Sequence, residues 1–512
     1  MVWTKECWVL MGIIIIGLWL LWYSKQNKMK KKSGVPKGNL GWPFIGETLD
    51  FIACGYTSQP VSFMDKRKSL YGNVFKTHIL GTPIIVSTDP DVNKVVLQNH
   101  GNTFVPAYPK SIRELLGDFS ILQMNGNLQK RVHAQIGGFL RSAQLKARIT
   151  KDIENSVKLT LATWKDMHLI YVQEEIKKIT FEVLVKVLMS IRPGEDLYFL
   201  KKEFEEFIKG LICLPIKLPG TRLYKSLKAK EKLLKMVKRI VEERKLAMEK
   251  SDEKGVAKDV VDVLLRDNNE ANEKQYLPLD FISGIIIEMM IPGEETMPTA
   301  MTLAVKFLSD SAVALKQLTF QCLPFLGYRK FMEWHLYIYI YADFISHCEG
   351  GEHGIEEAED RSHVKILVGL TTCPCHLLKI ETLRMANIIN GVWRKALKDV
   401  HIKGHLIPEG WCVLTSFISV HMDEQNYDNP CHFDPWRWEK TGAAAVNNNN
   451  FTPFGGGQRL CPGLELSRLE ISIFLHHLVT SYGWVAEKDE IIHFPTVKMK
   501  KKLPITVTPV RT

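Results

Sequence analysis

The sequence Phe454-Gly-Gly-Gly-Gln-Arg-Leu-Cys461-Pro-Gly463 lies near the end of the chain, directly before a long apolar segment. Its glycines permit positive φ angles and let the loop approach a flat group closely, which a Cβ atom would obstruct. The residues Leu464–Tyr482 follow a helical period, so Cys461 comes just before a predicted helix. The unpaired N–H groups and positive dipole end of that helix favour a thiolate, and Arg459 adds a nearby cation. A thiolate held in this way is a metal ligand or a nucleophile.

The order Phe454-x-x-Gly457-x-Arg459-x-Cys461-x-Gly463 resembles the haem-binding loop of the cytochrome P450 family. The resemblance implies haem b as cofactor, Cys461 as the axial thiolate ligand of its iron, and the other matched residues as cofactor-binding. The alternative is a glycine-rich turn around a buried structural cysteine. The matched positions, in order and directly before a helix, favour the haem loop.

The composition indicates a large protein with reduced thiols. The chain has 512 residues, of which 46% are hydrophobic, so it can bury a large core. Its 10 cysteines are scattered along the chain, which is typical of thiols facing the cytosol. The formal net charge is +11, with lysines spread over several segments. We therefore expect a membrane surface or an acidic protein partner, and no nucleic acid.

Residues 1–24 are predicted to form a single membrane anchor. Trp8–Tyr23 is uncharged, apolar and aromatic at both ends, and at about 1.5 Å per residue it suits the thin bilayer of the endoplasmic reticulum. A cleaved signal peptide is the alternative, but no small-residue cleavage site follows. Six lysines lie between positions 25 and 37, so the catalytic domain is expected in the cytosol. Residues 25–46 are predicted to be a basic, Pro/Gly-rich linker, and 47–512 the haem-thiolate monooxygenase domain.

The rest of the pattern predicts a mainly α fold with a small β-sheet on the N-terminal side, the α+β arrangement that the cytochrome P450 resemblance implies. An irregular segment is expected at Phe104–Gly117 because Pro106 and Pro109 interrupt it. The short β-like and longer helical patterns are Val74–Leu80, Pro83–Ser87, Pro90–Gln98, Asn127–Arg141, Glu174–Leu211, Tyr224–Met248 and Asp280–Asp310.

The predicted helix Asp280–Asp310 is interrupted at Ile291-Pro-Gly-Glu-Glu-Thr296. Proline kinks a helix, and Gly293 is expected to leave a gap for a small ligand or water. The resemblance makes Glu295 and Thr296 catalytic, since the family's oxygen-activating motif has an acidic residue and a threonine at these places. Splitting O2 consumes protons, so a carboxylate and a hydroxyl that relay protons through water suit the site. The alternative is an ordinary proline kink with a back-bonded threonine.

Glu381-Thr-Leu-Arg384 carries a carboxylate and a guanidinium one helical turn apart, a spacing that by itself is usually a surface ion pair. The resemblance joins both residues to Arg437, which lies among aromatic residues, in a buried triad around the haem loop. It also implies that Arg394 contacts a haem propionate.

His133 is a second candidate for a propionate contact. The family normally carries a Trp-x-x-x-Arg pair on this helix, whereas this chain has Gln129 and His133 at the two places.

Long runs of the sequence resemble a plant branch of the family, the brassinosteroid C-23 hydroxylases of the Rotundifolia type. They include Phe63–Tyr71, Leu97–Tyr108, Met289–Thr296 and Glu381–Trp393. The resemblance implies hydroxylation of 22-hydroxylated steroids at C-23 by O2, with electrons from NADPH through a membrane-bound cytochrome P450 reductase. The predicted substrate contacts are Asn387, Asn390 and Trp393.

Residues 320–380 depart from the family pattern. They include a tyrosine-rich run, a Gly/Glu patch and Cys373-Pro-Cys375-His376, but no second ligand pair for a zinc site. We interpret the segment as a lineage-specific insert or an incorrectly assembled reading frame.

Three other functions remain open. The first alternative is another steroid or terpenoid hydroxylase. The second is a haem-thiolate isomerase that needs no reductase. The third is a non-catalytic or misfolded product. Glu295 and Thr296 argue against the isomerase, which needs no proton relay to O2.

Overall fold

The structure is a computed structural model that describes residues 17, 33–42, 45–57, 59–98, 103–117, 120–250, 256–270, 276–322, 374–439 and 449–510. Apart from Gly17, the predicted anchor Trp8–Tyr23 lies outside these residues, and so does most of the atypical segment 320–380, including Cys373. Within the described ranges, no helix is both long and apolar enough to cross a bilayer.

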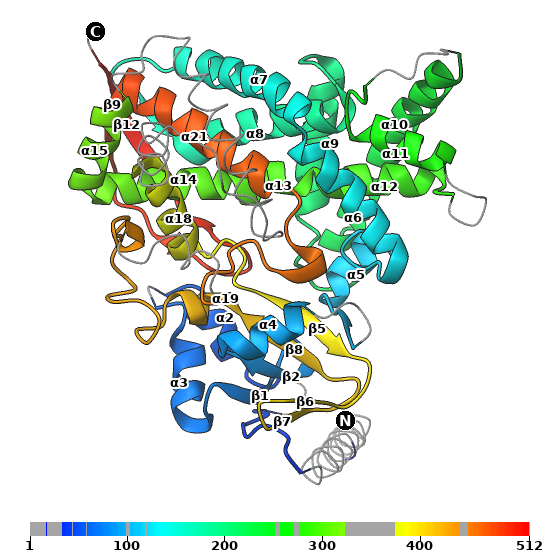
Figure 1. Ribbon diagram of the computed structural model, residues 1–512, viewed down its shortest axis with the longest axis vertical. Coiled ribbons are helices and arrows are strands. Elements are labelled where there is room, and N and C mark those ends of the chain that lie inside the picture. The colour runs from blue at the N-terminus through cyan, green and yellow to red at the C-terminus, as the bar shows by residue number, and fades with distance from the viewer. Residues whose placement is uncertain are drawn as a thin grey trace, which may run out of the picture.

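The molecule has a helical body and a smaller region built around a β-sheet, with α18 (Pro374–Ala386) between them (Figure 1). The main helices of the body are α6 (Gly126–Arg141), α7 (Ala143–Ala162), α8 (Val172–Met189), α9 (Glu195–Ile208), α10 (Arg222–Lys250), α11 (Val260–Glu270), α12 (Leu279–Met289), α13 (Ile291–Glu294), α14 (Thr296–Asp310), α15 (Ala312–Cys322) and α21 (Leu464–Ser481).

The sheet region carries short helices on both sides of its strands (Figure 1). Its elements are α2 (Thr48–Cys54), α3 (Ser62–Tyr71), β1 (Val74–Ile79), β2 (Thr82–Ser87), α4 (Pro90–Gln98), β3 (Phe104–Pro106), β5 (Gly391–Ala396), β6 (Val400–Ile402), β7 (His405–Ile407), β8 (Cys412–Ser416) and α19 (Phe417–His421).

The main sheet has the strand order β1-β2-β8-β5-β3. Strands β2 and β8 pair in parallel, whereas the other neighbours are antiparallel. Ile84, Ile85 and Val86 are fully buried, as expected for a strand covered on both faces. The predicted N-terminal sheet is therefore incomplete, because β5 and β8 come from the C-terminal half of the chain.

A second sheet, in the order β4-β12-β9, joins β4 (Leu169–Tyr171) to β9 (Tyr482–Ala486) through β12 (Pro504–Pro509). A hairpin of β10 (Ile491–Ile492) and β11 (Lys498–Met499) precedes β12. The loop between β10 and β11 reaches the kinked helix, since Thr299 Oγ1 donates to the Val497 carbonyl at 3.3 Å.

Most predicted helices are present, with differences that have local causes. The segment Glu174–Leu211 is two helices, because Ser190 ends α8 in a left-handed conformation at φ 57°. The segment Phe104–Gly117 is not irregular, since it contains β3 and α5 (Lys110–Leu116). Its prolines lie at compatible places, Pro106 ending the strand and Pro109 preceding the helix.

Helices α12, α14 and α21 pass through the main hydrophobic core. Ile286 on α12, Leu303 on α14 and Phe474 on α21 are fully buried. These helices are apolar around most of their circumference, as helices inside a large protein must be. They give the kinked segment and the Cys461 loop a rigid support.

Candidate functional site

The Cys461 loop is closed by its own backbone hydrogen bonds. The Cys461 N–H donates to the Phe454 carbonyl at 3.1 Å, and the Leu460 N–H donates to the Gly457 carbonyl at 3.1 Å. Between them lies one 3-10 turn, η3 (Gly457–Arg459). These bonds fix the backbone at Cys461, three residues before α21 begins at Leu464.

Burial raises the pKa of the Cys461 thiol, and a hydrogen bond from the Gly463 N–H only partly opposes this. Without a ligand on the sulfur, burial therefore outweighs the N–H contribution that was predicted to favour a thiolate. The reason is that α21 begins beyond the cysteine, so a single N–H group faces the sulfur while burial disfavours charge. Coordination to a metal would deprotonate the thiol, and the site then suits a thiolate ligand.

Position 457 requires a glycine because the end of a neighbouring helix lies against it. The φ of Gly457 is 64°, and a Cβ atom would lie 2.2 Å from the Leu97 carbonyl oxygen at the end of α4. This contact explains why a glycine stands at position 457, and the close approach of the loop to a flat group stays a prediction. Phe454 packs at the edge of an apolar cluster that includes Leu383 and Trp438, and so ties the loop to α18.

Two arginines lie together beside the loop, Arg394 buried and Arg459 half-buried. Arg394, on β5 and 7% exposed, donates to the Trp393 carbonyl at 3.0 Å and bonds the Tyr108 side chain. Arg459 donates to the backbone carbonyls of Leu122 and Met124. Burial lowers the pKa of Arg394, and burial together with the nearby Arg394 lowers the pKa of Arg459 to about 10.

These cations suit the anionic edge of a haem. In the part of the chain that the structure describes, neither Arg394 nor Arg459 forms an ion pair with a carboxylate. Both line one pocket, together with Val96, Leu97, Phe104, Asn125 and Gln458. A buried cation such as Arg394 is costly without a counter-ion, so this site, with the half-buried Arg459 beside it, is expected to bind an anion. The propionates of a haem would supply such an anion.

His133 contacts the cysteine loop itself. Its Nε2 lies 2.8 Å from the Leu460 carbonyl oxygen, and the Gln129 Nε2 donates to the Gln458 carbonyl at 3.2 Å. Burial lowers the pKa of His133. Because a carbonyl oxygen only accepts, the Nε2 atom carries the proton of this bond. The structure shows a backbone contact where a propionate contact was predicted.

The interruption of the predicted long helix is present, as the breaks between α12, α13 and α14. The kink has one partly exposed face, which carries Pro292, Glu295 and Thr296. The Thr296 hydroxyl lies 3.4 Å from the Pro292 carbonyl, and Thr496 Oγ1 lies 3.4 Å from a Glu295 carboxylate oxygen. The kink thus shows the back-bonded threonine of the alternative interpretation, with a carboxylate on the same face, and the proton relay stays a prediction.

The opposite side of the kink packs against α8. A Cβ on Gly293 would come within 3.0 Å of Leu184, so this glycine leaves no gap and the prediction of one is wrong. Its absent side chain lets the two helices approach, and Thr180 Oγ1 donates to the Gly293 carbonyl at 2.6 Å. Lys177 pairs with the buried Glu294 at 2.7 Å. The Thr180 bond satisfies a backbone carbonyl at the break, and the Lys177 pair partly compensates the buried Glu294 charge.

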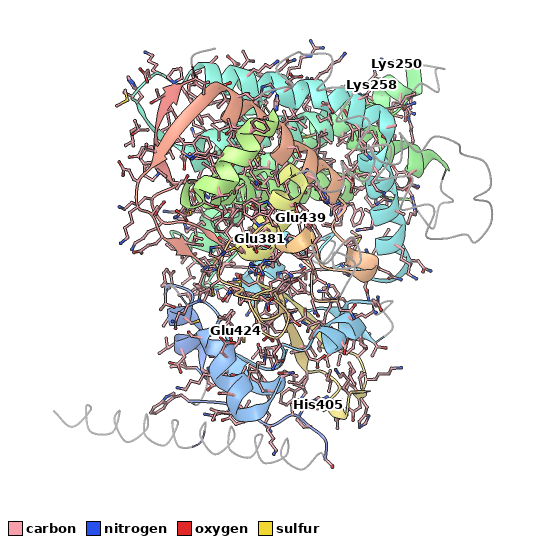
Figure 2. The ribbon with its side chains drawn as sticks, turned by 60° about the vertical axis from the view of Figure 1, so that its left-hand side comes forward. Lys250, Lys258, Glu381, His405, Glu424 and Glu439 are labelled. Carbon is pink, nitrogen blue, oxygen red and sulfur yellow. The ribbon has the colours of Figure 1, made fainter. Side chains whose placement is uncertain are left out.

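Glu381 is joined to both predicted arginines. Arg384 donates to its carboxylate at 2.9 and 2.7 Å, and Arg437 Nε donates at 3.1 Å. Glu381 and Arg384 are fully buried. Trp438 Nε1 and the Asp434 N–H add further hydrogen bonds to the same carboxylate. The triad ties α18 to the segment before the cysteine loop, and Glu381 lies near the centre of the molecule (Figure 2).

Two of the predicted substrate contacts have structural partners instead. Asn387, at φ 43°, donates to the Arg384 carbonyl at 2.8 Å and accepts a 2.8 Å bond from His421 Nδ1. Trp393 packs against the apolar cluster of the sheet region, because neighbouring strand residues face opposite sides and Arg394 occupies the other face. Only Asn390 keeps a free group, its Oδ1, which has no hydrogen-bond partner among the described residues.

The fold and the site define the class of protein. The profile of the cytochrome P450 family matches residues 36–319 and 380–508, and the chain belongs to this family. It is a cytochrome P450 monooxygenase. The atypical segment falls between the two matched ranges. A cyanobacterial cytochrome P450 solved with retinoic acid shares the fold at a TM-score of 0.71 and 22% identity, covering 93% of this chain and 99% of that one.

Plant steroid enzymes are among its similar relatives. The chain is 65% identical over 481 residues to 3-epi-6-deoxocathasterone 23-monooxygenase CYP90C1 of Arabidopsis thaliana, covering 94% of this chain and 86% of that protein. A second Arabidopsis protein with the same activity name, CYP90D1, is 46% identical over 92% of this chain and 89% of its own length. Arabidopsis 3beta,22alpha-dihydroxysteroid 3-dehydrogenase is 39% identical over 98% of this chain and 97% of its own length.

Several site residues were missed from the sequence alone. Tyr108 meets the site only through a tertiary contact that no spacing signals, whereas Gln129 was located by the family's spacing but not assigned to the site. Thr180 and Lys177 lie one helical turn apart on α8, but so do many residue pairs that have no function. His421 accepts from the Thr452 N–H at 3.0 Å, and its pKa is lowered by burial to about 3. It is a neutral linker of the core.

Proposed function

We propose that the protein hydroxylates the side chain of 22-hydroxylated steroids at C-23, in brassinosteroid biosynthesis. The observation that carries this proposal is the 65% identity, over 94% of the chain, to a protein named as a 23-monooxygenase of such a steroid. The 46% identity to a second protein of the same name supports it. The interrupted helix with Glu295 and Thr296 on its open face suits an oxygen-dependent reaction.

The residues that would hold haem b are Cys461, as a thiolate ligand of its iron, and the cations Arg394 and Arg459, as partners of the propionates. A thiolate-ligated haem supplies the cleavage of the O–O bond. Thr296 holds a proton at its hydroxyl on the open face of the kink, and Glu295 resupplies it through water. Thr496, 3.4 Å from the Glu295 carboxylate, orients that carboxylate.

Burial of the rigid steroid nucleus supplies most of the affinity, with few polar contacts. The 22-hydroxyl offers a directional group, and a site that bonds it rejects analogues without it far more strongly than a missing methylene would be rejected. Asn390 is the remaining candidate for this contact. Its Oδ1 is buried and unpaired within the described ranges, and its Nδ2 donates to the His493 carbonyl at 3.1 Å. The carbonyl oxygen can therefore accept a bond from a substrate hydroxyl.

Residues 1–24 anchor the protein in the endoplasmic reticulum membrane with its catalytic domain in the cytosol, where NADPH–cytochrome P450 reductase supplies electrons. The uncharged run Trp8–Tyr23 and the lysines after it support this orientation. Leu214 and Leu218, in the loop between α9 and α10, are 76% and 64% exposed, which suits contact with lipid.

The experiment compares paired steroids with and without the 22-hydroxyl in microsomes that contain the protein and the reductase. We expect a 23-hydroxylated product from the 22-hydroxysteroid and little turnover of its 22-deoxy analogue. Equal turnover of both, or oxygen inserted into the ring system, contradicts the proposal. Oxidation at C-3 instead would match the activity named for the 39% identical relative and would replace the proposed reaction.

A further inference from the structure

We propose that Gln129 and His133 form a clamp on α6 that positions the Cys461 loop for ligation of the haem iron. The clamp replaces the propionate contact expected of this helix. It requires haem ligation by Cys461 and does not depend on which steroid is the substrate. Gln129 and His133 are thus positioning residues, which act through the loop backbone.

The two side chains lie one turn apart on the same face of α6. Gln129 Nε2 donates to the Gln458 carbonyl at 3.2 Å, and His133 Nε2 meets the Leu460 carbonyl at 2.8 Å. A carbonyl oxygen only accepts, so both side chains are donors. The bonded carbonyls lie on either side of Arg459, and the second belongs to the residue before Cys461. The clamp therefore restrains the backbone next to the sulfur.

The helix that carries the clamp is itself held firmly. Its side chains Val132 and Ile136 are fully buried. Arg131 and Gln135 donate to the Asp267 carboxylate of α11 at 2.7 and 3.0 Å. A loop attached to this helix is therefore attached to the helical body, and not to a surface turn.

Arg459 fixes the same loop from a second direction. Its guanidinium donates to the Leu122 and Met124 carbonyls, just before α6 begins. Three successive loop residues, 458 to 460, are thus bonded to one short segment of chain around the start of α6. Without the clamp the arginine still holds its carbonyls, but the residue before Cys461 loses its external anchor.

The test uses His133→Ala and Gln129→Ala, with Asn127→Ala as the matched control, because Asn127 is an exposed amide on the same helix. The measurement is the rate at which the reduced carbon monoxide complex loses its thiolate-type absorption band, at one pH and without steroid. Each clamp variant is expected to lose the band about fivefold faster, the change for one hydrogen bond of about 1 kcal/mol. His133→Gln keeps a side-chain N–H donor and is expected to restore most of the wild-type rate. Asn127→Ala is expected to match the wild type.

Hydrogen exchange of the haem-free protein supplies a second readout. His133→Ala is expected to increase exchange in residues 454–463 while α6 stays protected. Increased exchange along the whole of α6 would show general unfolding and would overturn the proposal. A stable thiolate band with faster haem loss would mean that His133 holds a propionate, which also overturns it. A wild-type protein that shows the thiolate band but does not turn over steroids would contradict the proposed substrate and would not contradict the clamp.

Discussion

Replacing Glu381 with glutamine tests how the core around the cysteine loop is held. The fully buried carboxylate accepts from Arg384 at 2.9 and 2.7 Å, from Arg437 at 3.1 Å and from Trp438 at 3.0 Å. An amide removes the negative charge and turns one acceptor into a donor, which then faces these donors. Removing one partner of a buried ion pair costs about 3–5 kcal/mol, because the other charge stays buried without compensation.

The assay is urea unfolding of the detergent-solubilised full chain, followed by tryptophan fluorescence. Glu439→Gln is the matched control, since this exposed glutamate lies close to Glu381 in the view of Figure 2 and undergoes the same chemical change. We expect Glu381→Gln to lower the free energy of unfolding by about 3 kcal/mol or more. The control is expected to stay within about 0.5 kcal/mol of the wild type. A loss below about 1 kcal/mol for Glu381→Gln would refute the structural role of the triad.

Three further predictions concern the site and its surroundings. Thr296→Ala is expected to bind steroid normally but to divert reducing equivalents from NADPH into peroxide, and unchanged coupling of NADPH use to product would refute its role in proton delivery. Arg394→Leu is expected to speed haem transfer to a scavenger protein about tenfold, as for a lost charge-assisted hydrogen bond, and an unchanged rate would contradict the propionate assignment. The Ser120 hydroxyl donates to the Glu288 carboxylate on α12 at 2.6 Å. Burial raises the pKa of Glu288 from 4.5 to about 7. Because the folded protein holds this proton more tightly than the unfolded chain, stability falls as pH rises between these values, by at most about 1.4 kcal/mol per pH unit. Glu288→Gln is expected to remove that slope in unfolding titrations, and an unchanged slope would contradict the argument.

Short-range patterns predicted the site best. The cysteine loop, the Pro292 kink and the Glu381/Arg384 pair are each set by residues within a few positions of one another. Turn chemistry and helical periodicity act on that scale, so the sequence is sufficient to locate these features. The partners that each site residue contacts could not be predicted in the same way. His133 was identified as a site residue, but its bond to Leu460 depends on how α6 packs against the loop.

Long-range pairing and side-chain direction could not be predicted. The parallel pairing of β2 with β8 joins segments more than 300 residues apart, and no local pattern specifies it. Trp393 was assigned to the pocket, but a shift of one residue along a strand moves a side chain to the opposite face. Asn387 was assigned to the substrate, but its backbone is left-handed and its side-chain amide bonds His421 inside the core.

The most direct test of the account is the absorption spectrum of the reduced protein with carbon monoxide. The account predicts the band peculiar to thiolate-ligated haem in the wild type. It also predicts that Cys461→His loses this band, whereas Cys431→His, a change at an exposed cysteine, keeps it. An imidazole-type spectrum in the wild type, or a thiolate band that survives in Cys461→His, would contradict the assignment of Cys461 as the iron ligand.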